Sequence, residues 1–174
     1  MKTFVALTLL SSISIAANAG AQLDRIKTTG NIVIGFREAS APLSYIDADK
    51  RPIGYTIDIC NKIVDAIQKD LGLKTISKTY IPVVPANRIE TIATGIADLE
   101  CGSTTNTQDR REKVAFAIPH FMTGTKYLVR HDSYINDLND FRFKKLASIK
   151  GTAPMKGIVS ANAGRSININ ILNP

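Results

Sequence analysis

Two hydroxyl side chains and a guanidinium lie close together in one polar stretch: Ser103, Thr105 and Arg110. They follow an apolar run over residues 92–99, and Thr107 is predicted to cap an amphipathic helix directly after them. The free N–H groups of a helix N-terminus, two hydroxyls and a planar guanidinium together suit a small carboxylate. The stretch therefore predicts a carboxylate-binding pocket. An ordinary loop followed by a solvated helix face is the alternative.

Two further arginines are predicted to lie at the same place. Arg37 directly follows an expected buried strand, and Arg88 lies in the first turn of an expected short helix. Loops that leave the carboxyl ends of parallel strands meet at one edge of the sheet, where open α/β folds bind ligands. We therefore expect both arginines beside the loop 103–110. Surface pairing of the arginines with Glu38 and Glu90 is the alternative.

Strands and helices are expected to alternate over the first part of the chain. The helix over residues 57–71 has the clearest apolar spacing and is expected to end at Gly72. The order of elements implies a parallel sheet with right-handed crossovers. The expected elements are a helix over 22–29, a strand over 31–36, short strands around a turn over 46–55, the helix over 57–71, a strand over 74–84, a helix over 87–95 and a strand over 99–102.

The rest of the chain predicts a second, smaller α/β unit after a break at residues 119–124. Its expected elements are a strand over 125–130, a helix over 134–143, a strand over 145–149, a helix over 155–163 and a strand over 167–172. So small a piece is not expected to close a core of its own. The second unit is therefore predicted to be incomplete.

The first 19 residues have the pattern of a secretory signal peptide. Lys2 supplies a positive start, a short apolar core follows, and Ala17-Asn18-Ala19 forms a cleavage site. The apolar core is too short for a membrane span. We therefore expect export to the periplasm, with the mature chain starting at Gly20.

The charge of the chain is moderately basic, with 22 lysines and arginines against 15 aspartates and glutamates. The basic residues are scattered, and their longest runs are the pairs Arg110-Arg111 and Lys144-Lys145. Nucleic-acid binding needs a basic patch or stripe, so we expect no nucleic-acid partner.

The two cysteines, Cys60 and Cys101, are both predicted to lie in the core. Cys60 falls on the apolar stripe of a helix and Cys101 ends a buried strand, so we expect small buried residues with free thiols. A disulfide is the alternative, since an oxidising compartment permits it. With only His120 and His131 as further soft ligands, no metal-ligand cluster is visible, and we expect neither metal nor cofactor.

Several separated motifs resemble the polar amino-acid (family 3) solute-binding proteins of bacterial ABC importers, most of all their glutamate/aspartate-binding branch. The motifs are Gly35-Phe36-Arg37-Glu38-Ala39-Ser40-Ala41-Pro42-Leu43-Ser44-Tyr45, then Asn87-Arg88-Ile89, then Glu100-Cys101-Gly102-Ser103-Thr104-Thr105-Asn106 with Arg110. The resemblance runs from about residue 23 to residue 158. It implies an α/β, periplasmic-binding-protein-like (type II) two-lobed clamshell. It also implies a monomer that hands an amino acid to an inner-membrane ABC permease.

The resemblance implies a division of the chain into lobes. Residues 20–124 would form lobe 1, residues 125–130 a hinge or crossover strand, and residues 131–174 part of lobe 2. Family members are much longer, and their ligand-ammonium carboxylate would lie beyond Pro174. The resemblance therefore implies a C-terminally truncated member.

The resemblance also implies six ligand-binding residues: Arg37, Arg88, Ser103, Thr105, Arg110 and Thr152. The residues of the loop 103–110 would grip the α-carboxylate, the two earlier arginines would face a side-chain carboxylate, and the threonine would close over the ligand from lobe 2. Three arginines exceed the need of one carboxylate, so glutamate or aspartate is expected. Pro85 departs from the family, which often has a hydroxyl residue there.

An enzyme on the same fold, such as a dehydratase, is the main alternative function. Glu38 and Glu100 lie near the expected cleft, but neither has a histidine, cysteine or metal partner in a recognisable arrangement. We therefore expect binding without catalysis. A receptor-linked sensor module and a non-functional truncated remnant are further alternatives.

Overall fold

The computed structural model describes residues 19–173. The expected signal peptide therefore lies outside the described residues, apart from Ala19. Within residues 19–173, no helix has the length and apolar character needed to cross a membrane.

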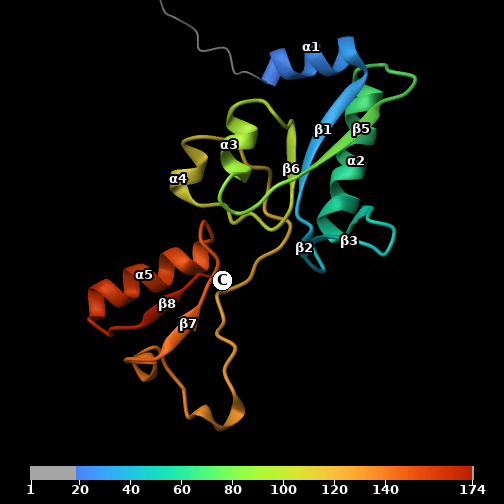
Figure 1. The fold of residues 1–174 in the computed structure, drawn as a ribbon. Coiled ribbons are helices and arrows are strands. Elements are labelled where there is room, and N and C mark those ends of the chain that lie inside the picture. Colours follow the sequence, from blue (N-terminus) through green and yellow to red (C-terminus); the bar gives the residue numbers. More distant parts are fainter. Residues whose placement is uncertain (1–18, 174) are drawn as a thin grey trace, which may run out of the picture.

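A three-stranded parallel sheet of order β5-β1-β6 forms the first unit (Figure 1). Helices connect its strands, which confirms the predicted alternation and the parallel sheet. The elements are α1 (Ala19–Thr29), β1 (Asn31–Phe36), α2 (Tyr55–Asp70), β5 (Ser77–Pro82), α3 (Arg88–Ala93), β6 (Leu99–Cys101) and α4 (Gln108–Arg111). All three strands end at the same edge of the sheet.

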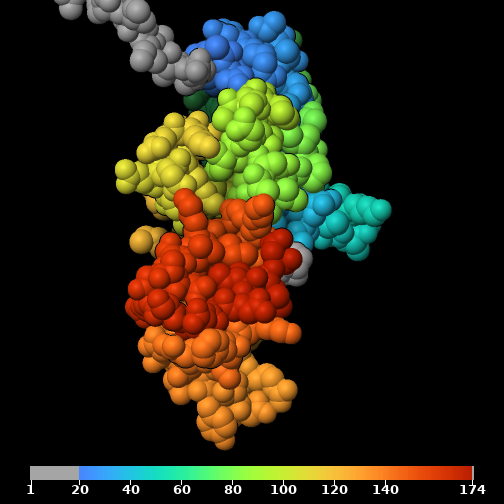
Figure 2. Space-filling view, turned by 60° about the vertical axis from the view of Figure 1, so that its left-hand side comes forward, coloured from blue at the N-terminus to red at the C-terminus, as the bar shows by residue number. Residues whose placement is uncertain are grey.

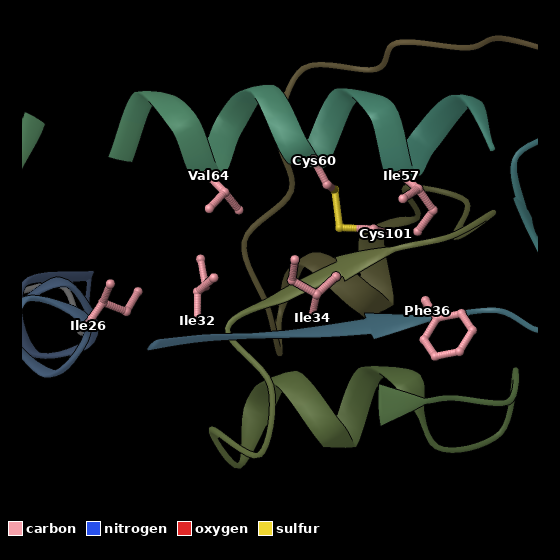
Figure 3. Packing of buried hydrophobic residues seen from close by; sticks show 8 residues of the cluster. All are labelled: Ile26, Ile32, Ile34, Phe36, Ile57, Cys60, Val64 and Cys101. Carbon is pink, nitrogen blue, oxygen red and sulfur yellow. A yellow bond between two sulfur atoms is a disulfide. The ribbon is translucent and has the colours of Figure 1, made fainter. Parts of the chain in front are cut away.

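The core of this unit lies between α2 and the sheet. Ile57 and Val64 recur at helical spacing on one face of α2, and Figure 3 shows them directed toward Ile32 and Ile34 of β1. The two strand residues are completely buried, as expected for the central strand of a covered parallel sheet. α2 ends as predicted, because Gly72 adopts a φ of 65° that other residues rarely adopt.

A small antiparallel sheet lies just beyond β1. Its strands are β2 (Ala39–Ser40), β3 (Ser44–Ile46) and β4 (Pro52–Ile53), in the order β2-β3-β4. The carboxylate of Asp47 closes the turn between β3 and β4 by accepting the backbone N–H groups of Asp49 and Arg51 at 2.9 and 2.8 Å. This confirms the expected polar turn with short flanking strands.

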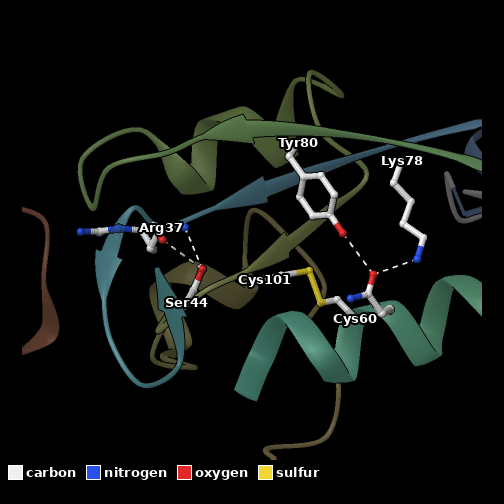
Figure 4. The surroundings of a disulfide bond; sticks show 7 residues. Arg37, Ser44, Cys60, Lys78, Tyr80 and Cys101 are labelled. Carbon is white, nitrogen blue, oxygen red and sulfur yellow. Dashed lines mark hydrogen bonds between the residues drawn. A yellow bond between two sulfur atoms is a disulfide. The ribbon is translucent and has the colours of Figure 1, made fainter. Parts of the chain in front are cut away.

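Cys60 and Cys101 form a disulfide, so the expectation of two free thiols is wrong (Figures 3 and 4). Both residues are buried, as predicted. The Cα atoms lie 6.2 Å apart because the inner face of α2 packs against the end of β6, and this separation suits a disulfide. Apolar spacing places each cysteine in the core, but it carries no information on the distance between two elements 41 residues apart.

Asp98 ties the start of β6 to β1 and α1. Its Oδ2 accepts the backbone N–H of Val33 at 2.7 Å and also accepts a guanidinium N–H of Arg25. The Asp98 side chain is only 4% exposed. At the amino end of the sheet, the buried Asp98 carboxylate therefore accepts the backbone N–H of Val33 in place of a backbone carbonyl group.

The second unit is a small parallel β-α-β arrangement. β7 (Lys145–Ala147) pairs with β8 (Asn170–Leu172), and α5 (Ala153–Arg165) connects them, which confirms the predicted order at the end of the chain. Its core consists of Phe141, Ile158, Ile167 and Ile169.

Two expected elements before β7 are wrong. Residues 125–130 form no strand, because no described strand lies beside them to complete a ladder, and Leu128 is fully exposed. Residues 134–143 form no α-helix, and the only helical structure there is a short 3₁₀ turn over Asn139–Phe141. The Asp140 carboxylate accepts the backbone N–H groups of Asn136 and Asp137 at 2.8 and 3.0 Å, which stabilises a turn instead of a helix.

The second unit lies beyond the carboxyl edge of the first sheet (Figures 1 and 2). A long connection leads from α4 to β7, with only 3₁₀ turns along it. Figure 2 shows the second unit packed directly against the first, and Gly151 and Lys156 make contacts across the boundary. The edge predicted to bind ligand is therefore the edge that the second unit covers.

We predict that the double variant Cys60→Ala, Cys101→Ala is less stable. The disulfide closes a loop of 41 residues, for which the chain-entropy account gives about 4 kcal/mol of unfolding free energy. Urea unfolding of the first unit, followed by circular dichroism, measures this difference. An unchanged unfolding midpoint would contradict the account.

We also predict that Asp98→Ala destabilises the first unit by about 1 to 3 kcal/mol, because the half-buried N–H of Val33 loses its acceptor. The exposed Asp24 on α1 offers the control Asp24→Ala, which is expected to change the unfolding free energy by less than about 0.5 kcal/mol. Equal unfolding curves for the two variants would show that Asp98 has no such role.

Candidate functional site

A cavity of about 420 Å³ lies between the two units, at the carboxyl edge of the first sheet. Five of the six residues expected to bind ligand line it: Arg37, Arg88, Ser103, Thr105 and Thr152. A larger hollow of about 590 Å³ lies within the second unit, but none of the six residues lines it. The structure therefore brings together side chains from three loops of the first unit and one of the second.

Arg88 is held at the cavity wall by the turn that joins β5 to α3. The side-chain carbonyl of Asn87 accepts the backbone N–H of Val84 at 2.8 Å, and this tight turn places Arg88 as the first residue of the helix. Arg88 is only 3% exposed. Its Nε and Nη1 are buried and have no hydrogen-bond partner among the described residues. Burial of a guanidinium without an acceptor is unfavourable in free energy, so this side chain is suited to binding an anion.

Arg37 is held by a buried serine. Its backbone N–H donates to Oγ of Ser44 at 2.9 Å, and that hydroxyl donates back to the carbonyl oxygen of Arg37 at 3.2 Å (Figure 4). Ser44 is completely buried. The Arg37 side chain extends away from this pair, and its buried Nε has no partner in the described part of the chain. Sequence reasoning missed Ser44, because its role depends on the pairing of β2 with β3.

The charges behind the cavity are unbalanced. Burial lowers the pKa of Arg88 to about 10, Glu100 opposes this shift, and the neighbouring Arg110 and Arg37 add to it. Burial likewise raises the pKa of Glu100, although the Thr104 hydroxyl and the three guanidinium groups oppose that shift. Three arginines and one glutamate therefore share one region, which leaves a net positive charge for an anion to neutralise.

The loop with Ser103 and Thr105 leads into a much shorter helix than expected. α4 spans only Gln108–Arg111, so the prediction of an amphipathic helix is wrong. Thr107 occupies the N-cap position, but its hydroxyl donates to the Asp109 carboxylate at 2.8 Å and caps no backbone N–H. The short helix leaves the two cavity-lining hydroxyls in the loop.

Arg110 lies beside the cavity and is not among its lining residues. Its Nη1 donates to the carbonyl oxygen of Thr105 at 2.7 Å, and its Nη2 donates to that of Gly151 in the second unit at 3.0 Å. Gly151 has a φ of 79°, and a Cβ there would lie 2.8 Å from the carbonyl oxygen of Pro85. Only glycine allows the two units to approach so closely at this point.

Two further interactions hold the second unit in place. Lys156 of α5 forms an ion pair of 2.7 Å with Asp109, and this contact lowers the pKa of the Asp109 carboxyl to about 2. Thr152 caps α5, because its hydroxyl accepts the backbone N–H of Met155 at 3.3 Å and donates to the carbonyl oxygen of Ile149 at 2.6 Å. The cavity is therefore covered by an ordered helix start.

The arrangement suits the binding of a small organic anion. Two arginines with free donor groups and five hydroxyl residues share the wall with apolar residues such as Ile149 and Pro154. Among residues 19–173, no group of three or more histidine, cysteine, aspartate or glutamate side chains is placed to hold a metal ion.

Comparison with known proteins places the chain in a family. Residues 32–164 match the family model of bacterial extracellular solute-binding proteins, family 3. An L-glutamate/L-aspartate-binding protein of Pseudomonas aeruginosa is 34% identical over 174 residues, which cover 99% of this chain and 58% of the relative. A glutamate/aspartate import solute-binding protein of Salmonella typhimurium is 39% identical over 137 residues, which cover 79% of this chain and 45% of the relative. The chain thus spans about half the length of these relatives.

Solved structures share the fold. A truncated, arginine-bound ArgBP from T. maritima superposes with a TM-score of 0.73 at 22% identity, over 87% of this chain and 66% of that one. A cysteine-binding protein from Campylobacter jejuni gives a TM-score of 0.69 at 26% identity, over 87% of this chain and 58% of that one. The resemblance stated from the motifs is confirmed, and so is the α/β type II clamshell fold. The chain belongs to the bacterial extracellular solute-binding proteins, family 3.

Proposed function

We propose that this chain captures an acidic amino acid, glutamate or aspartate, outside the cytoplasm for delivery to an inner-membrane ABC permease. The observation that carries the proposal is the Arg88 guanidinium, which is buried in the cavity wall and has two nitrogen atoms without an acceptor among residues 19–173. A carboxylate of the ligand would supply that acceptor.

The number of arginines supports a ligand with two carboxylates. Arg110 already donates to two backbone carbonyl groups, whereas Arg37 and Arg88 keep buried nitrogen atoms without partners in the described chain. A carboxamide ligand such as glutamine lacks the side-chain carboxylate and would leave the guanidinium groups of both Arg37 and Arg88 without an anion. That omission costs several kcal/mol, so acidic ligands are favoured.

The six residues take the following roles in this proposal. Ser103 and Thr105 hold the α-carboxylate, and Arg110 joins them by exchanging the Gly151 carbonyl for a ligand oxygen. Arg37 and Arg88 bind the side-chain carboxylate. Thr152 stays at the start of α5 and covers the ligand.

The lobes proposed for this function follow the two packed units: residues 20–124 as lobe 1, residues 125–130 within the hinge, and residues 131–174 as part of lobe 2. The relatives named for glutamate and aspartate support the ligand class, and the family description as extracellular supports export. We propose a periplasmic monomer. We propose binding without catalysis, which is supported by relatives that are named binding proteins.

Calorimetric titration of the purified chain with glutamate, aspartate and glutamine tests the proposal. Binding of both acidic ligands, with glutamine much weaker, is the expected result. The titration is repeated on the chain fused to the C-terminal part of the P. aeruginosa relative. Failure of both proteins to bind an acidic ligand, or a preference of either for glutamine, would overturn the proposal.

We predict that Arg88→Met weakens the binding of glutamate by about 30-fold or more, because a buried carboxylate of the ligand loses its charged partner. The exposed Arg142 provides the matched control Arg142→Met, which is expected to bind as the unchanged protein does. Titration of both variants at one salt concentration measures the difference. Equal affinities would show that Arg88 does not contact the ligand.

A further inference from the structure

Glu100 is a buried acidic residue that the proposed binding mode does not use. It lies in the middle of β6, opposite Gly35 of β1. It is not among the residues that line the cavity. Its Oε1 is buried and has no hydrogen-bond partner in the described part of the chain. A role for Glu100 must therefore act through its neighbours.

The nearest charged neighbours of Glu100 are the arginines of the cavity wall. A Cβ at Gly102 would lie 2.4 Å from Oε1 of Glu100 and 2.8 Å from Cγ of Arg37, so both side chains pass close to this glycine. Arg88 on α3 and Arg110 on α4 also act on the Glu100 charge. Glu100 thus lies beside the Arg37 side chain and within electrostatic reach of the Arg88 and Arg110 guanidinium groups.

Fold stability does not account for this carboxylate. Burial raises the pKa of Glu100 in spite of the Thr104 hydroxyl and the three arginines, so removal from water outweighs their combined effect. A carboxyl group with a raised pKa in the folded state lowers stability as the pH rises through that pKa. A buried residue that lowers the stability of the fold and lies next to a binding site is more often retained for function than for folding.

We propose that Glu100 is a positioning residue that directs the guanidinium groups of Arg37 and Arg88 toward the ligand carboxylate. This inference rests on the proposed function, since it assigns a role in the same site. The carboxylate provides the attraction that keeps two long, mutually repelling side chains in one arrangement while the cavity is open. The ligand then meets arginines that are already in place, and less side-chain entropy is lost on binding.

Replacement of Glu100 distinguishes a positioning role of this residue from a purely electrostatic role. Removal of a negative charge beside three arginines strengthens the attraction of the site for an anion, so a purely electrostatic role predicts tighter binding for Glu100→Gln. A positioning role predicts the opposite, because Arg37 and Arg88 lose the attraction of the one carboxylate near them. The two roles therefore differ in the sign of the change.

The experiment compares Glu100→Gln with Glu90→Gln, the same chemical change at an exposed position of α3. Glutamate affinity is measured by calorimetry and the midpoint of thermal unfolding by circular dichroism. We expect Glu100→Gln to bind about tenfold more weakly and to unfold at the same or a higher temperature. Glu90→Gln is expected to match the unchanged chain in both measurements.

The pH dependence of glutamate affinity is a second measurement, and a purely structural role of Glu100 would leave it unchanged. Glutamate binding by the unchanged chain and by Glu90→Gln is expected to weaken as Glu100 protonates, beginning above its ordinary pKa of 4.5, whereas Glu100→Gln is expected to lack this step. Both curves share the titration of the ligand itself, so their difference isolates Glu100.

The outcomes separate the two proposals. No binding of acidic ligands by the unchanged chain and by its extended version would overturn the proposed function. Binding by the unchanged chain with equal or tighter binding by Glu100→Gln would overturn the positioning role alone. A parallel loss of affinity and unfolding temperature in Glu100→Gln would also overturn it, because that result shows a structural role.

Discussion

The need of the buried Arg88 guanidinium for an acceptor is the constraint on which the rest of the site depends. The residue is 3% exposed, and among the described residues two of its nitrogen atoms have no partner. Folding around such a group is unfavourable unless another part of the molecule compensates. Here the compensation comes from a covalently tied core and from one nearby carboxylate. The proposed ligand would supply the remaining negative charge.

The first unit supplies the rigidity that this arrangement requires. The Cys60–Cys101 disulfide joins α2 to the end of β6. The next residue, Gly102, is the glycine beside which the Glu100 and Arg37 side chains pass. The pairing of β1 with both neighbouring strands brings the loops that carry the arginines to one edge. The second unit then covers that edge through backbone and ion-pair contacts. Local interactions build each loop, and the parallel sheet brings the loops together.

Much of the fold and the placement of the site followed from local patterns, because β-branched strands, the α2 stripe and the parallel order each depend on nearby residues. The convergence of Arg37 and Arg88 at one edge follows from that order alone. The disulfide and the role of the buried Ser44 did not follow, because the first depends on the distance between two elements and the second on the pairing of β2 with β3. The helix expected over 134–143 failed for a local reason, since Asp140 binds backbone N–H groups that a helix would use.

The most direct measurement is the ¹H–¹⁵N NMR signal of the Arg88 Nε–H group, assigned by its loss in an Arg88→Lys variant, during titration with glutamate and then glutamine. A new charge-assisted hydrogen bond moves this proton downfield and slows its exchange with water. The account predicts both changes with glutamate and neither with glutamine at equal occupancy. An Arg88 signal that stays unchanged while glutamate binds would contradict the claim that this guanidinium receives the ligand carboxylate.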